Sequence, residues 1–118
     1  MTIKSYKELL VWQKSVDLCV EIYKITDKFP KSELYGLTLQ IRKCAVSIPS
    51  NIAEGQRRGH KAEYIQFLQT SFGSGAELET QLLIANKIQY LSDENYKKLS
   101  SSLDELMRML NGLLKSLK

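Results

Sequence analysis

A helical repeat of apolar residues that continues across a proline is the feature that most restricts how this chain can fold. Between residues 34 and 52 apolar side chains recur at intervals of three and four, the spacing of one helix face. The members of this face are Leu34, Leu37, Ile41, Cys44, Ala45, Ile48 and Ile52. Pro49 lies inside the repeat, although a proline in a helix interior costs ~3 kcal/mol because it lacks an N–H and crowds the carbonyl four residues back.

Two interpretations of this proline are open. The segment is either one kinked helix, or a helix that ends at Ile48 followed by a second that begins at Pro49, a favourable first-turn residue. We favour one kinked helix, from a cap at Ser32 to about Gln56, because the apolar face keeps its phase through the proline. The polar residues that flank the break, Ser47, Ser50 and Asn51, can bond the freed backbone groups.

Three further helices are predicted. One begins at the capping box of residues 5–8 (Ser5-Tyr6-Lys7-Glu8) and ends near residue 28, and another covers residues 61–90. The last is capped by Ser92 and carries a seam of apolar residues at alternating spacings of three and four. The seam comprises Tyr96, Leu99, Leu103, Leu106, Leu110, Leu113 and Leu117. Four long helices and short turns predict one all-α domain over residues 1–118, an antiparallel up-down-up-down four-helix bundle with a proline kink in helix 2.

The first helix carries more apolar surface than one bundle requires. Its apolar residues form two stripes, Leu9, Trp12, Val16, Cys19 and Tyr23 on one and Val11, Leu18, Ile22 and Ile25 on the other. Together they cover over half of the helix circumference, whereas an arc of about 100° or somewhat more suffices in a bundle. We therefore expect a homo-oligomer; the alternative is that exposed apolar residues are common on monomers.

The third predicted helix contains the small-residue stretch 72–76 (Phe72-Gly73-Ser74-Gly75-Ala76). Each mid-helix glycine costs ~1 kcal/mol relative to alanine. We expect a compensating reason for this cost, namely that the small residues allow another helix to approach closely. The expected neighbour is the segment around Pro49, or another subunit. A loop at Gly73–Gly75 is the alternative, which we reject because the apolar phase continues from Phe67 to Leu82.

Composition favours a cytoplasmic protein. The first four residues lack the apolar core of a signal peptide, and no apolar run approaches the ~20 residues that span a membrane. Cys19 and Cys44 lie on apolar faces and are expected to be free, buried thiols. The net charge is +4, and residues 1–61 hold eleven Lys or Arg against six Asp or Glu, which is compatible with nucleic acid.

The sequence lacks the residues that most enzymes use for catalysis. His60 is the only histidine, which argues against histidine-dependent catalysis and against any metal site with two histidines. No strand precedes a glycine-rich loop that could hold a phosphate cofactor. We therefore expect no enzyme, no cofactor and no metal. Glu54 is expected to form a structural ion pair with Arg42.

The string around Pro49 resembles a known family. Residues 42–58 read Arg42-Lys43-x-Ala45-Val46-Ser47-Ile48-Pro49-x-Asn51-Ile52-Ala53-Glu54-Gly55-x-x-Arg58, which looks like the signature of the bundle proteins encoded in intervening sequences of bacterial 23S rRNA genes. Three other segments resemble the family in order: Leu10-Val11-Trp12-Gln13-Lys14; Phe29-Pro30-x-x-Glu33-x-Tyr35-Gly36-Leu37; and Phe67-Leu68 with Gly73-Ser74-x-x-Glu77-Leu78-Glu79. The resemblance implies a bacterial four-helix bundle. Distant relatives, the accessory proteins of diversity-generating retroelements, form five-fold rings, so it also implies a homopentamer.

Two functions follow from this reading. In the first, the oligomer binds RNA or DNA through basic surface residues, with Tyr64 nearby to stack or hydrogen-bond. The candidate residues are Arg42, Lys43, Arg57, Arg58, His60 and Lys61. The alternative for those near residue 60 is a solvated helix end where positive charge is favourable. In the second function, the oligomer is a scaffold that docks a protein such as a reverse transcriptase or a ribosome-associated factor.

Overall fold

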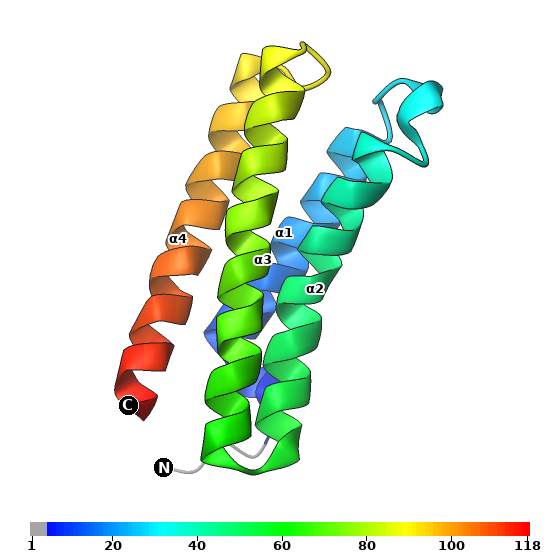
Figure 1. Cartoon of the computed structure of the whole chain (residues 1–118). Coiled ribbons are helices and arrows are strands. Elements are labelled where there is room, and N and C mark those ends of the chain that lie inside the picture. Colours follow the sequence, from blue (N-terminus) through cyan, green and yellow to red (C-terminus); the bar gives the residue numbers. More distant parts are fainter. Residues whose placement is uncertain (1–4) are drawn as a thin grey trace.

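A computed structural model describes residues 5–118 as a four-helix bundle, shown in Figure 1. Its α-helices are α1 (Leu10–Thr26), α2 (Leu37–Arg58), α3 (Lys61–Lys87) and α4 (Asp93–Leu117). Two single-turn 3-10 helices precede the first two, η1 (Tyr6–Glu8) before α1 and η2 (Lys31–Glu33) before α2. No strand occurs in this described range, so the predicted all-α bundle is confirmed. The stretch Met1–Lys4, where no signal peptide is expected, lies outside it.

The helices follow one another around the bundle. α1 packs against α2 and α4, α2 against α3, and α3 against α4. The molecule is elongated, with principal extents of 45 × 24 × 19 Å. In Figure 1 the α2–α3 turn and the C-terminus lie at one end of the bundle, and the α3–α4 turn and η2 lie at the opposite end. η1 returns to contact α2, which brings the beginning of the chain beside residues of the fifties.

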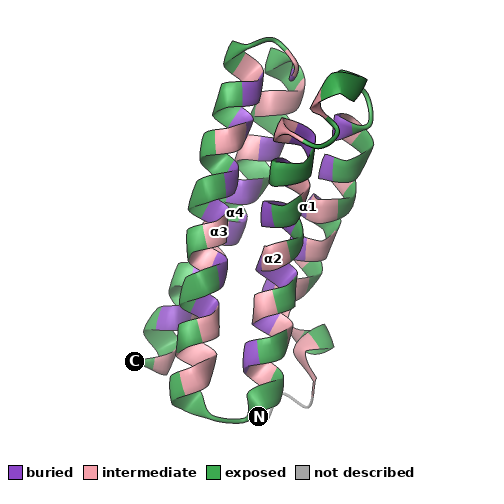
Figure 2. Ribbon diagram, turned by 45° about the vertical axis from the view of Figure 1, so that its right-hand side comes forward, coloured by how far each residue is buried: buried purple, intermediate pink, exposed green. Residues whose placement is uncertain are grey.

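Buried apolar side chains form one cluster along the bundle axis, on the inner faces seen in Figure 2. From α4 it takes Leu99, Leu103, Leu106 and Leu110, as the seam predicts. The seam then continues through Leu114, while Leu113 and Leu117 are only half-buried. On α1 the stripe with Val11, Leu18 and Ile22 is buried, and the other stripe is partly exposed. Both cysteines are free thiols, as expected, and Cys44 is buried as predicted, but Cys19 is only half-buried, so its predicted burial is wrong.

Pro49 lies within a single helix, because α2 runs unbroken from Leu37 to Arg58. This confirms one helix rather than two; the bend itself stays a prediction. The polar neighbours predicted to bond near the proline do so in part: Asn51 Nδ2 donates to the Ser47 carbonyl at 2.8 Å and to its hydroxyl at 2.9 Å. Residues of α3 add to this, since Ser71 Oγ donates to the Ile48 carbonyl at 2.9 Å and the Ser74 and Ser47 hydroxyls lie 2.8 Å apart.

The two mid-helix glycines of α3 do not pack against the proline, so that expectation is wrong. A methyl group added at Gly75 would collide with Met107 of α4, and one added at Gly73 would meet nothing within 4 Å. The continuous helix over this stretch does confirm the rejection of a loop. Serines, rather than glycines, form the α3 contact with the Pro49 segment, because Ser71 donates to α2 and Ser74 shares a hydrogen bond with Ser47.

Two predicted helix starts are wrong by one short turn. Ser5 caps η1 instead of α1, its Oγ accepting from Lys7 N at 3.1 Å, because Leu9 then takes an extended conformation. Ser32 caps nothing; Glu33 Oε1 accepts from Leu37 N at 3.1 Å at the start of α2. The same carboxylate oxygen lies beside Gly36, where any β-carbon would be 2.6 Å from it.

The third and fourth helices are closer to prediction. Ser92 Oγ accepts from Asn95 N at 3.1 Å, which confirms the predicted N-cap of α4. α3 begins at Lys61 as predicted and ends at Lys87, three residues early, because Gln89 takes a positive φ of 70° that stops the helix.

Candidate nucleic-acid interface

The six predicted contact residues do not form one site. Arg42 and Lys43 lie in the first half of α2, and the others lie at or beside the α2–α3 turn. At 1.5 Å per helical residue, the fifteen residues from Arg42 to Arg57 span ~22 Å. The fold therefore divides the candidates into two groups, of which only the second lies at the end of the bundle.

Arg42 ties α2 to the C-terminal turn of α1. Its Nε donates to Thr26 Oγ1 at 3.0 Å and its Nη2 to the Tyr23 carbonyl at 3.3 Å. The guanidinium also lies 4.5 Å from the centre of the Tyr23 ring, a cation–π contact. The expected pair with Glu54 is wrong, because these contacts hold Arg42 near α1 while Glu54 lies three turns further along α2.

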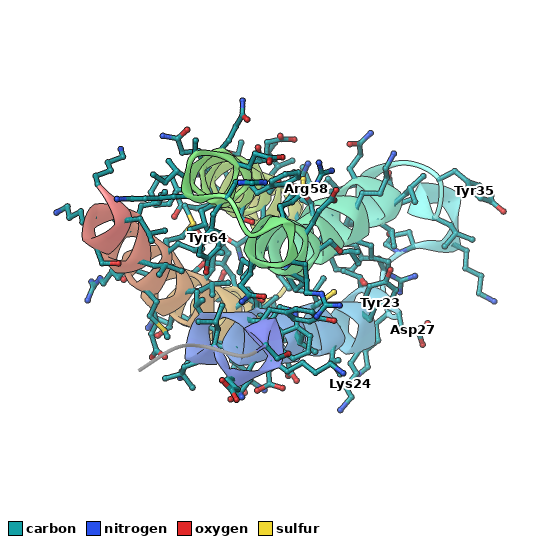
Figure 3. The ribbon with its side chains drawn as sticks, turned by 90° about the horizontal axis from the view of Figure 1, so that it is seen from below. Tyr23, Lys24, Asp27, Tyr35, Arg58 and Tyr64 are labelled. Atoms are coloured by element: carbon teal, nitrogen blue, oxygen red, sulfur yellow. The ribbon has the colours of Figure 1, made fainter. Side chains whose placement is uncertain are left out.

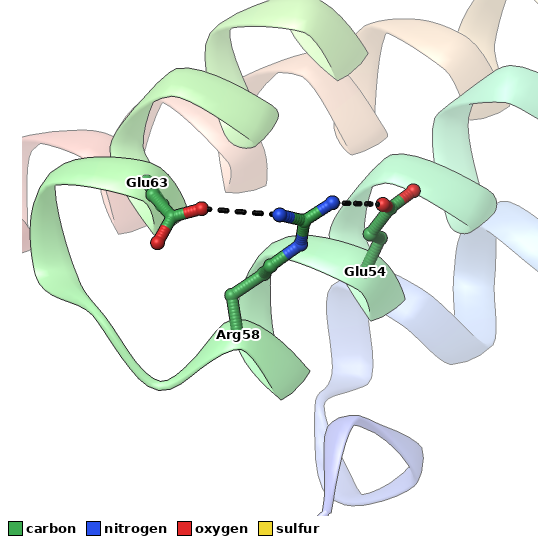
Figure 4. A network of polar contacts seen from close by, with 3 residues as sticks. All are labelled: Glu54, Arg58 and Glu63. Carbon is green, nitrogen blue, oxygen red and sulfur yellow. Dashed lines mark hydrogen bonds and ion pairs between the residues drawn. The ribbon is translucent and has the colours of Figure 1, made fainter.

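Arg58 is likewise occupied within the fold, as Figure 4 shows. Its Nη2 lies 2.7 Å from Glu54 Oε2, one turn earlier on α2, and its Nη1 lies 3.3 Å from Glu63 Oε2 on α3. The guanidinium stands 5.2 Å above the centre of the Phe67 ring. Hydrogen bonding to Glu54 raises the pKa of Arg58 still further. Two carboxylates offset one cation, so Arg58 offers a polyanion little net charge.

The α2–α3 contact beside this cluster also uses Tyr64. A β-carbon at Gly55 would lie 2.6 Å from Phe67 Cβ and 3.2 Å from Tyr64 Cδ1, so α3 approaches α2 closely at this glycine. Burial raises the pKa of the Tyr64 phenol, consistent with a ring that is half enclosed between helices. Tyr64 therefore packs in the hairpin and is poorly placed to stack on a base.

Arg57, His60 and Lys61 remain as exposed residues of the turn. None of the three forms an ion pair within residues 5–118. Gly59 makes the turn possible, because its φ of 75° is the left-handed conformation that ends α2. The turn thus presents two cations, Arg57 and Lys61, that have no ion-pair partner in the described residues.

A polar groove lies next to Arg57, between η1 and α2. It encloses about 540 Å³ and is lined by Ser5, Tyr6, Lys7, Ser50, Ala53, Glu54 and Arg57. The sequence analysis overlooked Lys7, since no local signal indicates that residues 5–7 return to the C-terminal half of α2. The groove adds Lys7, another cation without an ion-pair partner in the described residues, to the turn end of the molecule.

A second groove, which we call the apolar groove, lies at the opposite half of the bundle between α1, the loop before α2, and α2. It also encloses about 540 Å³, and its walls are Tyr23, Leu34, Tyr35, Leu39, Arg42, Lys43, Val46 and Ser47. All five of its large apolar side chains are exposed, and Tyr35 is the extreme at 86%. Figure 3 shows Tyr35 pointing away from the helices. Of these side chains, Tyr23 belongs to one of the two apolar stripes predicted on the first helix, and Leu34 was predicted on the buried face of the second helix, which is wrong because it is 46% exposed.

A smaller apolar surface lies on the C-terminal part of α3. Leu83, Ile84 and Ile88 are each 40–48% exposed. The carboxylate of Glu79 precedes Leu83 by one helical turn and has no ion-pair partner in the described chain. The bundle therefore exposes two separate apolar surfaces, with different charges beside them.

The described residues contain neither a cluster placed to hold a metal ion nor a cysteine with a lowered pKa. No group of three or more His, Cys, Asp or Glu in residues 5–118 is placed to hold a metal ion. Cys44 Sγ donates to Glu77 Oε2 at 3.5 Å, and burial together with that carboxylate raises the pKa of the thiol. Burial also raises the pKa of Cys19. Both thiols are therefore weak nucleophiles at neutral pH. Across the same residues, no helix is both long and apolar enough to cross a bilayer.

Comparison with known proteins assigns the family. The model of the 23S rRNA-intervening sequence protein family matches residues 7–112, nearly the whole chain. The chain belongs to that family. A solved structure with the same fold is a protein of unknown function from the S23 ribosomal protein family of Bacteroides thetaiotaomicron, at 22% identity and a TM-score of 0.83. The alignment covers 90% of this chain and 96% of that one. No curated protein matches.

In this 23S rRNA-intervening sequence protein, much of the string that carries the resemblance holds helices together. Glu54 and Arg58 clamp the α2–α3 hairpin, and Gly55 admits Phe67 of α3. Arg42 fixes the end of α1. These residue choices are explained by packing within one chain, whereas the exposure of Tyr35 is not.

Proposed function

We propose that this 23S rRNA-intervening sequence protein is a non-enzymatic homo-oligomer that binds RNA. The apolar groove is the observation that carries the assembly. A groove with five exposed large apolar side chains is costly on a monomer and is typical of an interaction surface. Tyrosine and arginine, which are both present there, are enriched at protein interfaces.

A second copy is the occupant that fits best. The cations Arg42 and Lys43 border the apolar groove, and the carboxylate of Glu79 lies beside the apolar surface of α3. Two different, complementary surfaces on one chain give a heterologous contact, which closes into a ring when the rotation allows. A pentamer is the ring size implied by the family resemblance.

RNA binding is supported by the turn end of the bundle. Arg57, His60 and Lys61 are exposed there without carboxylate partners, and a ring would repeat them once per subunit. Repetition of a weak site raises its avidity without new contacts. Lys43 belongs to the other surface and is assigned to assembly instead.

Light scattering on an eluting peak tests the assembly. The wild type is expected to elute as an oligomer, and Leu39→Asp, which buries a charge in the interface, is expected to give monomers. Leu10→Asp is the matched control: Leu10 is also exposed, it lies outside both apolar surfaces, and an acidic residue suits the first turn of a helix. A wild-type monomer at micromolar concentration would contradict self-assembly. In that case the apolar groove would be assigned to a different protein, the scaffold alternative.

Mobility-shift assays with 23S rRNA fragments over a series of salt concentrations test the proposed RNA binding. Binding to RNA is expected to weaken as salt rises, with log K falling by ~0.7 per phosphate contact on single strands. Replacing both His60 and Lys61 by Ala is expected to weaken binding to all sequences alike, because phosphate contacts carry no base information. Absence of binding at low salt would refute RNA binding and leave the assembly unaffected.

A further inference from the structure

We propose that the polar groove between η1 and α2 binds a phosphodiester of single-stranded RNA, with Lys7 and Arg57 as its cations. This inference rests on the proposed RNA binding and names the subsite and the form of RNA. It also adds Lys7, which lies fifty residues before Arg57 in the sequence.

The charge balance of the groove favours an anion. Lys7 and Arg57 line it, and neither has an ion-pair partner within residues 5–118. The one carboxylate in the lining, Glu54, already accepts from Arg58 at 2.7 Å. The two groove cations therefore have no ion-pair partner. Arg58, the neighbour of Arg57 in the sequence, differs because it pairs with Glu54 and Glu63.

The wall that carries Lys7 is fixed in advance. Lys7 N donates to Ser5 Oγ at 3.1 Å, and the Lys7 carbonyl accepts from Gln13 Nε2 at 2.8 Å. Both backbone polar groups of Lys7 are therefore held, one by its own turn and one by α1. The opposite wall is α2 itself, so a ligand meets a groove whose two sides need little ordering on binding.

The donor set suits a phosphate. A guanidinium can bind two phosphate oxygens at once, and a lysine ammonium adds a point charge. Hydroxyl groups of Tyr6 and Ser50 lie in the same lining and can donate to the remaining oxygens. A volume of about 540 Å³ is large enough for one nucleotide unit.

An aromatic wall favours a single strand over a duplex. The Tyr6 ring is held edge-on to Trp12, with ring centres 5.2 Å apart and planes at 69°. An aromatic ring next to a basic groove is the combination that single-strand-binding surfaces use, because unpaired bases can stack while cations follow the backbone. Bases within a duplex are already stacked and are not offered to such a ring.

The test compares two double variants of equal charge loss by fluorescence anisotropy with a labelled single-stranded RNA oligonucleotide. Lys7→Ala/Arg57→Ala removes the groove cations. Lys24→Ala/Lys28→Ala removes two exposed lysines at the opposite end of the bundle, one in the last turn of α1 and one two residues beyond its end. Losing two phosphate contacts is expected to lower the salt slope by ~1.4 and to weaken binding roughly 50-fold at 50 mM salt, with a smaller loss in the control. Melting curves establish that both variants fold.

Each outcome decides a different statement. Equal weakening by the two double variants would overturn the groove and leave RNA binding, as bulk electrostatics, in place. No binding by the wild type at 50 mM salt would overturn RNA binding and the groove together. In an NMR titration, single-stranded RNA should shift the Lys7 and Arg57 signals more than inorganic phosphate does at equal ionic strength. Shifts with phosphate alone would show an anion site that does not take RNA, and would overturn the proposal.

Discussion

Arg57 and Arg58 are neighbours of the same type with opposite roles. Successive helical residues point about 100° apart, so Arg58 faces α3 and meets Glu63 and Phe67, while Arg57 faces η1 and the polar groove. Sequence reasoning treated them as one basic pair, because composition reveals charge but not which face receives a carboxylate. Separating them requires the helix phase and the position of the partner helices.

Glycine tolerance at the α2–α3 contact gives the first prediction. Gly55→Ala places a β-carbon against Phe67 Cβ at 2.6 Å, and overpacking of this kind costs 1–3 kcal/mol, offset by ~1 kcal/mol of helix propensity. A net loss of up to about 2 kcal/mol is expected in urea denaturation. Gly73→Ala is the control: it meets nothing within 4 Å and should stabilise by up to ~1 kcal/mol. Equal effects at the two positions would contradict the close approach at Gly55.

At the scale of elements, apolar periodicity was sufficient to predict four helices and most of the buried faces of α2 and α4, but it also placed Leu34 on a buried face, although that residue lies before α2 and is 46% exposed. The periodicity correctly predicted that α2 continues through Pro49, since one face of the helix is buried from Ile41 to Ile52. The starts of α1 and α2 could not be predicted as well. Ser5 caps a 3-10 turn, and such a serine looks the same in sequence as one that caps an α-helix, whereas Ser32 lies within η2 and Glu33 accepts from the first amide of α2 instead. The long-range hydrogen bonds that decide these ends, such as Tyr90 to Glu33, have no local signature.

Substitution of the helix proline gives the second prediction. Pro49 has no N–H, so the carbonyl of Ala45 lacks its usual partner within α2. Pro49→Ala supplies that donor, and we expect a folded bundle whose α2 straightens and shifts against Ser71 and Ser74. In hydrogen exchange the introduced amide should be protected as well as its neighbours in α2. Rapid exchange of that amide would show that the backbone stays open at this point without the proline.

The link between the α3–α4 turn and the start of α2 gives a pH-dependent prediction. Tyr90 Oη donates to Glu33 Oε2 at 3.1 Å, and this hydrogen bond raises the pKa of Tyr90. A raised pKa in the folded state means that the stabilisation is present below the unfolded value of ~10 and is lost as pH rises through the folded value. Tyr90→Phe should therefore melt below the wild type at pH 7–9, and the gap should close above pH ~10.

Glu33→Gln is the companion variant for this measurement. It keeps an oxygen to accept from Leu37 N but removes the charge that disfavours the phenolate of Tyr90. The pH at which the Tyr90 contribution disappears should then move down. A gap between wild type and Tyr90→Phe that is independent of pH would mean that the phenol stabilises by packing on Phe29, its other neighbour, 5.9 Å between ring centres.

At the scale of the whole molecule, the candidate sites depend on which segments meet. Lys7 and Arg57 are fifty residues apart and share a groove only because η1 returns to α2. The apolar groove likewise joins Tyr23 of α1 to Tyr35 and Val46. The wide apolar arc of the first helix did indicate more apolar surface than the bundle buries. The most exposed aromatic side chain, Tyr35, belongs to an irregular loop, where periodicity carries no information.

Self-assembly through the apolar groove predicts that stability depends on protein concentration. A native oligomer that unfolds to monomers is stabilised by mass action, so its Tm should rise over a hundredfold increase in concentration. Tyr35→Asp places a carboxylate at the centre of the proposed contact, where a buried unpaired charge is strongly unfavourable. The Tm of this variant should lose its concentration dependence. At the lowest concentration it should equal that of the dissociated wild type, because Tyr35 is 86% exposed and contributes little to the bundle itself. Leu10→Asp should keep the dependence. If the Tm of the wild type is the same at every concentration, the folded chain does not assemble, and the exposed groove is a surface for another protein.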